Sequence, residues 1–260
     1  MTEVRPKKQL GQHFLADNRI AQRIVDSVNQ EEFSSIVEVG PGMGVLTKGL
    51  LTKYADKFFA VEVDEESVAY LHKNYPEFGQ NLIYGDFLNI PIDDKFGNSI
   101  VVIGNLPYNI SSQIFFKILD LRQRVHQVVA MVQREVAQRI AEKPGSKTYG
   151  ILSVLLQAYY NIEYLFTVNE GSFIPPPKVK SAVIRLTRNS VNELGCNPAL
   201  FVRVVKTAFN QRRKTLRNSI RSGFEGVEID EPFASKRAEQ LSVADFVTLT
   251  NSIEAKIASL

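Results

Sequence analysis

The sequence of 260 residues contains one cysteine, three scattered histidines and no tryptophan. A single cysteine, Cys196, excludes an intramolecular disulfide, and the Cys/His spacing of a zinc site is absent. No apolar run is long enough to span a bilayer, and the N-terminal stretch MTEVRPKKQLGQHF lacks the apolar core of a signal peptide. We therefore expect a cytoplasmic protein that needs neither a membrane nor a metal.

The composition is that of a globular protein, with 44% hydrophobic and 23% charged residues. The net charge of +3 is small, but its distribution is uneven. Residues 203–221 contain no acidic residue and carry the cations Arg203, Lys206, Arg212, Arg213, Lys214, Arg217 and Arg221. Such a local excess of positive charge indicates a polyanionic partner, although a solvated helix face is the simpler explanation of an isolated basic run.

Short apolar runs alternate with helical patterns over the first two thirds of the chain. This alternation predicts a parallel sheet with helices on both faces. The expected strands are 34–40, 57–64, 81–86, 98–105 and 126–132, and residues 45–54, 65–75 and 111–121 have helical spacing between them. Two further runs, 161–169 and 181–188, flank a proline-rich segment and are expected to pair at the sheet edge.

The pattern changes near residue 189. The stretch RNSVNELGCNP (188–198) is typical of a linker, and the chain after it is mostly helical, including residues 201–220. We therefore expect an α/β, Rossmann-like domain over 1–188, with a basic N-terminal arm, and a small all-helical domain over 189–260.

The ends of three predicted strands carry residues suited to adenosine. Gly40, Gly42 and Gly44 follow the first strand and would let a ligand approach the backbone. Glu62 ends the second and can accept hydrogen bonds from both ribose hydroxyls. Asp86 follows the third and can accept from an adenine amine, or simply cap the next helix. The GxGxG spacing lacks the last glycine of the dinucleotide motif, which favours S-adenosylmethionine over NAD.

The strand 98–105 ends in Asn-Leu-Pro-Tyr. The side-chain oxygen of Asn105 and the backbone carbonyl of Leu106, held extended by Pro107, can both accept from an exocyclic amine and favour its tetrahedral form. Tyr108 offers a ring on which a base can stack, a contact worth roughly 1–3 kcal/mol. The pattern predicts methyl transfer to an adenine amine, with the rate coming chiefly from in-line placement.

A second aromatic residue precedes a stiff segment. Phe173 stands before the prolines at 175–177, which would hold its ring rigidly. We predict that Phe173 covers the other face of the target base, and the alternative is that it packs within an edge strand.

These motifs resemble those of the ribosomal RNA adenine dimethyltransferase family, and most closely its bacterial small-subunit members. They occur in the family's order over nearly the whole chain. The matching stretches are GQHFL (11–15), VEVGPGMGVLT (37–47), the GD of IYGDF, GNLPYNISS (104–112), QREVAQRI (133–140), SKTYGILSV (146–154), FIPPPKVKSAVIRL (173–186) and AFNQRRKTLRNSI (208–220).

The resemblance implies a cofactor, a reaction and a partner. The cofactor is S-adenosylmethionine, bound by His13, Leu15, Gly40, Glu62, Asp86 and Asn105. His13 replaces the Asn of some relatives, which leaves open whether its ring or its backbone serves. The reaction is transfer of two methyl groups to N6 of each of two adjacent adenosines in a hairpin loop near the 3′ end of 16S rRNA. The partner is the small ribosomal subunit or its precursor, and the protein is expected to be a monomer.

Four cations of the basic run are the expected RNA contacts because they cluster within the last motif. They are Arg212, Arg213, Lys214 and Arg217. Three alternatives stay open at this point. The chain can be a resistance-type methyltransferase of large-subunit RNA, a non-catalytic assembly factor that kept the fold, or a nicotinamide-dependent oxidoreductase.

Overall fold

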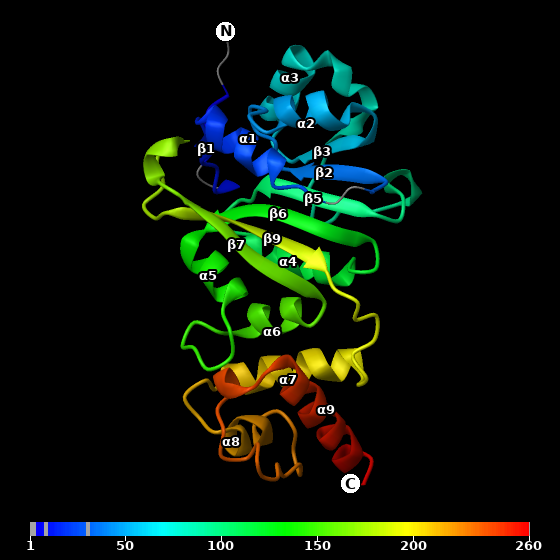
Figure 1. The fold of residues 1–260 in the computed structure, drawn as a ribbon, viewed down its shortest axis with the longest axis vertical. Helices are drawn as coiled ribbons and strands as arrows, with labels where there is room; N and C mark the ends of the chain where they lie inside the picture. Colours follow the sequence, from blue (N-terminus) through cyan, green and yellow to red (C-terminus); the bar gives the residue numbers. More distant parts are fainter. Residues whose placement is uncertain (1–3, 8–9, 30–31, 260) are drawn as a thin grey trace. The chain divides into compact units, whose positions relative to one another are not determined.

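A computed structural model of the chain describes residues 4–7, 10–29 and 32–259 (Figure 1). The chain divides into two compact units. The first comprises Met1–Ala137 and Ile162–Arg188, and the second comprises Gln138–Asn161 and Asn189–Leu260. Within the described residues, no helix is both long and apolar enough to cross a membrane.

A seven-stranded sheet with the order β4-β3-β2-β5-β6-β9-β7 organises the first unit. The first five of these strands run parallel, and β9 is antiparallel to β6. The bounds are β2 Ser35–Val39, β3 Phe58–Glu62, β4 Leu82–Tyr84, β5 Ile100–Asn105, β6 Val125–Gln133, β7 Tyr160–Val168 and β9 Ser181–Arg188. The Rossmann-like arrangement predicted from the alternation is confirmed, with β9 and β7 at the edge. Strands β2, β3 and β4 follow one another toward one edge of the sheet, and β5 and β6 lie on the other side of β2. The strand order therefore reverses between β2 and β5.

Both faces of the central strands are buried, as a parallel sheet between helices requires. All five residues of β2 are buried, and Ile36 packs in a core with Ile24, Leu50 and Leu71. The right-handed crossovers usual between parallel strands would put α2 and α3 on one face and α4 on the other. The helices of this unit are α1 Asn18–Asp26, α2 Thr47–Tyr54, α3 Glu65–Asn74 and α4 Ser111–Asp120, and α5 Arg134–Ala141 begins in it.

A separate two-stranded sheet joins the N-terminal segment to a distant part of the chain. Strand β1 (Phe14–Leu15) pairs antiparallel with β8 (Phe173–Ile174), with Phe14 opposite Ile174 and Leu15 opposite Phe173. Leu15 and Phe173 are buried in the main core. This anchor determines where residues 10–13 run.

The second unit is helical, as predicted. It contains α6 Ile151–Gln157, α7 Pro198–Asn210, α8 Leu216–Arg221 and α9 Val243–Ile257. The rings of Tyr149 and Phe209 lie 6.2 Å apart, and those of Phe209 and Phe246 lie 6.0 Å apart. Residues 138–161 therefore pack with this unit, whereas the sequence pattern predicts that all of 1–188 belong to the first domain. The difference arises because the chain leaves the first unit after Ala137 and returns to its sheet along β7. A single domain boundary in the sequence cannot describe a unit made of two separate segments.

Residues 201–220 do not form one continuous helix, contrary to the sequence-based expectation. Helix α7 ends at Asn210, and α8 begins only at Leu216. The backbone N–H of Leu216 donates to the Lys236 carbonyl at 2.7 Å, and that of Arg217 donates to the Ala234 carbonyl at 3.2 Å. These first-turn N–H groups thus find acceptors outside the helix, so tertiary hydrogen bonds favour a new helix start over continuation.

Candidate functional site

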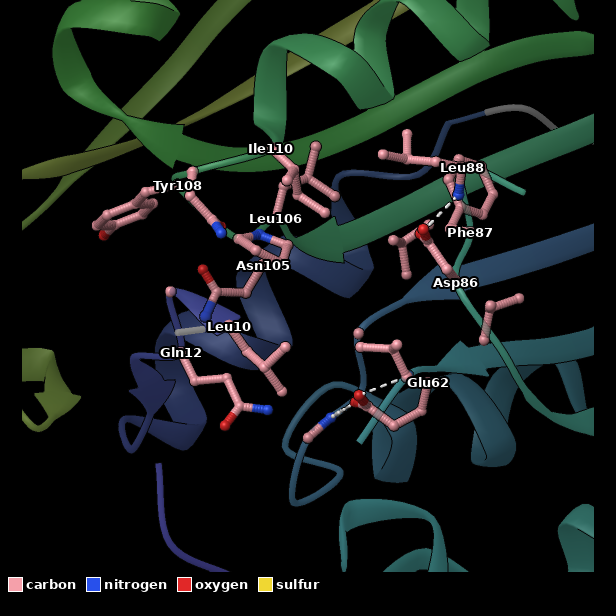
Figure 2. Close-up of a pocket in the computed structure, with 18 of the residues that line it drawn as sticks. Leu10, Gln12, Glu62, Asp86, Phe87, Leu88, Asn105, Leu106, Tyr108 and Ile110 are labelled. Carbon is pink, nitrogen blue, oxygen red and sulfur yellow. Dashed lines mark hydrogen bonds between the residues drawn. The ribbon is translucent and has the colours of Figure 1, made fainter. Parts of the chain in front are cut away.

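A cavity of about 300 Å³ lies at the carboxyl ends of β2, β3, β4 and β5, the usual ligand position in an open α/β sheet (Figure 2). The residues that follow these four strands form most of its wall, and the N-terminal segment 10–14 adds the rest. The lining includes Val39, Gly40, Gly42 and the ranges 61–63, 85–88 and 105–110. Leu10, Phe87, Leu88 and Ile110 supply apolar surface, which suits a flat purine ring.

The glycine loop after β2 presents backbone to the cavity. Gly40 has a φ of +67°, which favours glycine, and a Cβ built on it would meet nothing within 4 Å. A Cβ on Gly42 would come within 2.8 Å of the Phe14 ring. Gly42 therefore lets β1 pack close, while Gly40 leaves room for a ligand to reach the main chain.

The carboxylate of Glu62 is held rigidly at the end of β3. Its Oε1 accepts from the N–H groups of Val63 and Asp64, both at 2.9 Å, and its Oε2 accepts from the Gly42 N–H at 3.0 Å. Burial raises the pKa of Glu62, and these three N–H groups oppose the rise. Of its four lone-pair sites, one on Oε2 stays open for a hydroxyl, so the site is preorganised at a fixed position.

A second buried carboxylate, Glu38 on β2, lies behind this site. Thr47 Oγ1 donates to Glu38 Oε2 at 2.6 Å, and Glu62 and Tyr75 are its other electrostatic neighbours. Burial, together with repulsion from Glu62, raises the pKa of Glu38 to about 8. The folded protein thus binds this proton more tightly than the unfolded chain does.

The raised pKa predicts a pH-dependent stability. The stabilisation that the folded protein gains from the bound proton of Glu38 is fully present below the ordinary pKa of 4.5. It is lost as the pH rises toward about 8. Glu38→Gln stays neutral at every pH, so wild type should lose, relative to this variant, on the order of a few kcal/mol of unfolding free energy between about pH 5 and about pH 8. Urea unfolding of both proteins across this range measures the difference. An identical pH dependence would contradict the assignment.

Asp86 caps a turn after β4, where the sequence suggested the cap of a helix. Its Oδ1 accepts from the Leu88 N–H at 2.9 Å, and its Oδ2 accepts from the Asn89 side-chain amide at 2.7 Å. It therefore caps the turn after β4. Its carboxylate also lines the cavity (Figure 2). The hydrogen bond from an adenine amine to this carboxylate stays a prediction.

The amide of Asn105 is oriented by the N-terminal segment. Asn105 Nδ2 donates to the backbone carbonyl of His13 at 2.8 Å. Because a carbonyl can only accept, this bond assigns the nitrogen to His13 and leaves Oδ1 as an acceptor for a ligand. Leu106 is 1% exposed, and its N–H donates to the Met131 carbonyl at 3.0 Å. The side chain of Asn105 and the backbone of Leu106 are thus each held by a hydrogen bond to a backbone carbonyl.

Tyr108 is a fixed aromatic wall of the cavity. Its hydroxyl hydrogen-bonds to Ser181 Oγ, and its ring stacks on the His13 ring with centroids 5.3 Å apart and planes at 28°. Burial raises the pKa of the phenol, so it stays neutral at physiological pH. His13 Nδ1 lies 3.0 Å from the Pro175 carbonyl and donates to it. The backbone carbonyl and the ring of His13 are therefore both held in place at the cavity wall.

Two predicted site residues do not line the cavity. Phe173 is 2% exposed and Leu15 is 4% exposed, and they face each other across β1 and β8 within the main core. The structure therefore places Phe173 in edge-strand packing rather than against Tyr108. Its stiff proline context in the sequence does not distinguish a ring held in a core from one held in a pocket.

The predicted RNA contacts differ in their surroundings. Arg212 donates to the backbone carbonyls of Lys147 and Tyr149, and its Nε lies 3.6 Å from Glu239. Arg212 thus stabilises the loop that precedes α6 through two backbone carbonyls. Arg213 and Lys214 are exposed in the turn between α7 and α8. Arg217 on α8 faces Glu231 at 3.5 Å, and both side chains are more than half exposed.

The sequence reasoning missed several contributors to the cavity. Leu10 and Gln12 line it, as do Phe87 and Ile110. Gln12 lies within a motif that the resemblance had singled out, but nothing in its type or spacing marked it as a lining residue. The apolar wall has no sequence signal either, since apolar residues at strand ends are common.

Comparison with known proteins places this site in a family. The family model described as "Ribosomal RNA adenine dimethylase" matches residues 4–255. A protein of Bacteroides fragilis named "Ribosomal RNA small subunit methyltransferase A" is 57% identical over 257 residues, covering 98% of this chain and 94% of its own length. A protein of the same name from Cytophaga hutchinsonii is 51% identical and covers 98% and 100%.

Two solved structures share the fold at low sequence identity. A dimethyladenosine transferase from Plasmodium falciparum superposes with a TM-score of 0.77 at 24% identity, covering 94% of this chain and 98% of the other. The 23S rRNA methyltransferase ErmE superposes with a TM-score of 0.64 at 22% identity, covering 93% and 99%. Both support the architecture described above.

Proposed function

This chain belongs to the ribosomal RNA adenine dimethylase family, and from that premise we propose that it modifies 16S rRNA. The proposed reaction transfers two methyl groups from S-adenosylmethionine to N6 of each of two adjacent adenosines in a hairpin loop near the 3′ end. The substrate is the small ribosomal subunit or its precursor, in the cytoplasm, and the enzyme acts as a monomer. The names and high identity of the bacterial relatives support this choice of RNA.

The residues of the cavity fit the proposed cofactor. Glu62 offers an oriented acceptor to a ribose hydroxyl, Asp86 offers one to an adenine amine, and Gly40 leaves the backbone open beside them. When bound, S-adenosylmethionine would supply an electrophilic methyl group on a sulfonium centre. No pyrophosphate-binding glycine is required, in keeping with the GxGxG spacing.

The chain's own groups would handle the amine. The lone pair of an adenine amine is delocalised into the ring, and two acceptors on its protons favour the tetrahedral geometry needed for attack. Asn105 Oδ1 is one acceptor, and the Leu106 carbonyl is the other proposed one. Tyr108 would hold the base by stacking, so the reaction relies on placement rather than on a general base.

One observation carries the proposal most directly. The bond from Asn105 Nδ2 to the His13 carbonyl leaves the amide oxygen as the group offered to the ligand. An acceptor oriented in advance costs no reorganisation when the transition state forms. This arrangement favours catalysis over a purely structural role in ribosome assembly.

The strongest alternative is modification of large-subunit RNA, because ErmE shares the fold. A fold in common does not specify the RNA, and the 57% identity to a small-subunit enzyme contrasts with 22% to ErmE. The test is to incubate purified protein with labelled S-adenosylmethionine and undermethylated 30S or 50S subunits, then map the modified bases by primer extension. We expect label on two adjacent adenosines of 16S rRNA. Label on 23S rRNA, or none, would overturn the proposal.

The exposed turn between α7 and α8 is the proposed phosphate contact. Arg213→Ala/Lys214→Ala should weaken binding to 30S subunits and reduce the slope of log affinity against log salt by about 1–2, because each phosphate contact releases a counterion. Cofactor affinity should be unchanged. A salt titration of binding, for wild type and variant together, measures both effects.

A matched control removes the same charge from the same run. Lys206→Ala/Arg221→Ala changes two exposed cations on α7 and α8 and should leave the salt slope near that of wild type. Arg212→Ala should instead lower thermal stability, because it strands the carbonyls of Lys147 and Tyr149. Equal slopes for wild type and the Arg213/Lys214 variant would mean that this turn is only a solvated surface.

A further inference from the structure

An ion pair joins the start of the described chain to the start of α3. Lys7 Nζ contacts Asp64 Oδ1 directly and lies 3.2 Å from Glu66 Oε1. The Asp64 side chain is 1% exposed, whereas that of Glu66 is 58% exposed. A buried carboxylate needs a partner far more than an exposed one does, so Asp64 is the important end of this contact.

Asp64 belongs to the same turn as the proposed ribose acceptor. Its backbone N–H donates to Glu62 Oε1 at 2.9 Å, and its own Oδ2 accepts from Ser67 Oγ at 2.8 Å. Burial opposes the ionisation of Asp64, but its hydrogen bonds with Lys7 and Ser67 outweigh this and hold its pKa below the ordinary value. Two carboxylates two residues apart repel each other, and Lys7 neutralises one of them.

On its other side, Lys7 is tied to the segment that lines the cavity. The Lys7 N–H donates to Gln12 Oε1 at 2.8 Å, and the Leu10 N–H donates to the Lys7 carbonyl at 3.0 Å. Leu10 and Gln12 both line the cavity (Figure 2). The far end of this segment is held separately, by the bond from Asn105 to the His13 carbonyl and by the β1–β8 pairing.

We propose that Lys7 is a positioning residue for the cofactor. Its ion pair with Asp64 fastens residues 10–14 along the cavity beside the Glu62 turn, and so slows the release of a bound S-adenosyl ligand. The inference rests on the proposed function for the identity of that ligand. It adds a residue that does not itself line the cavity.

The test is the affinity of Lys7 variants for S-adenosylhomocysteine, measured by calorimetry without RNA. Lys7→Met should raise the dissociation constant about five- to tenfold, the lower part of the range for coupled sites because Lys7 is partly exposed. Stopped-flow measurement should assign the change mainly to faster dissociation. In turnover, the effect should fall on the KM for S-adenosylmethionine rather than on kcat. Lys7→Arg keeps the charge and should restore affinity to near the wild-type value.

Two further variants separate the ion pair from a general charge effect. Arg5 is an exposed cation on the same segment that makes no ion pair within the described residues, and Arg5→Met should leave cofactor affinity unchanged. Combining Lys7→Met with Asp64→Asn should cost no more affinity than Lys7→Met alone, because the two changes remove one interaction. Should Asp64→Asn fail to fold, the Met and Arg variants of Lys7 carry the test by themselves.

The contrary outcomes are distinguishable. Unchanged affinity in Lys7→Met, with wild type binding normally, would overturn this inference alone. So would equal losses of RNA binding in Lys7→Met and Arg5→Met at constant cofactor affinity, since the segment would then be a phosphate contact. A wild-type protein that binds no S-adenosylhomocysteine would overturn the proposed function, and this inference with it.

Discussion

Asn105→Ala is expected to lower single-turnover methyl transfer by roughly 10²–10³-fold, the loss seen when one oriented hydrogen-bonding group is removed from a reacting centre. The variant loses Oδ1, the acceptor that the bond to the His13 carbonyl orients. That acceptor acts on the amine chiefly as the transition state forms, so the loss should appear in the rate more than in binding. Rapid-quench assays with 30S subunits at saturating cofactor measure it.

Two controls locate the effect. Cofactor affinity of the variant should fall only modestly, because Glu62 and Asp86 remain in place. Asn105→Asp keeps an acceptor but loses the N–H that His13 orients, so its rate should lie between those of wild type and Asn105→Ala. Near-normal transfer by Asn105→Ala would remove Asn105 from the mechanism.

Glu62→Ala should raise the dissociation constant for S-adenosylhomocysteine about ten- to a hundredfold, because a hydrogen bond to a charged group is worth roughly 1.5–3 kcal/mol. The rate at saturating cofactor should stay close to that of wild type. Calorimetry measures the affinity, and a single-turnover assay at high cofactor concentration measures the rate. Unchanged affinity would mean that the ribose does not sit at the end of β3.

The structure adds a second consequence for this residue. Glu62 also accepts from the N–H groups of Gly42, Val63 and Asp64, so Glu62→Ala should lower the melting temperature as well. Glu62→Gln retains the size and one acceptor oxygen and should lose less of both properties. Glu65→Ala is a matched control, since it removes an exposed carboxylate three residues away that does not line the cavity.

Local patterns in the sequence were enough for the parallel sheet and for several polar residues around the cavity. Buried strands such as 98–105 are continuous apolar runs, and in a parallel sheet their carboxyl ends meet at one edge. The sequence therefore predicts that four polar or glycine positions lie together at this edge, namely Gly40, Glu62, Asp86 and Asn105. Their shared edge follows from strand direction alone, which alternation along the chain already reveals.

Contacts between distant segments decided the rest. Burial of Phe173 depends on its pairing with Leu15, and the orientation of Asn105 depends on a carbonyl 92 residues earlier. The break after Asn210 depends on acceptors at Ala234 and Lys236, and the ion pair of Lys7 depends on Asp64. Residue type and spacing predict what a side chain can do. Which partner it meets is set by the closure of long loops, and no periodicity in the sequence records that.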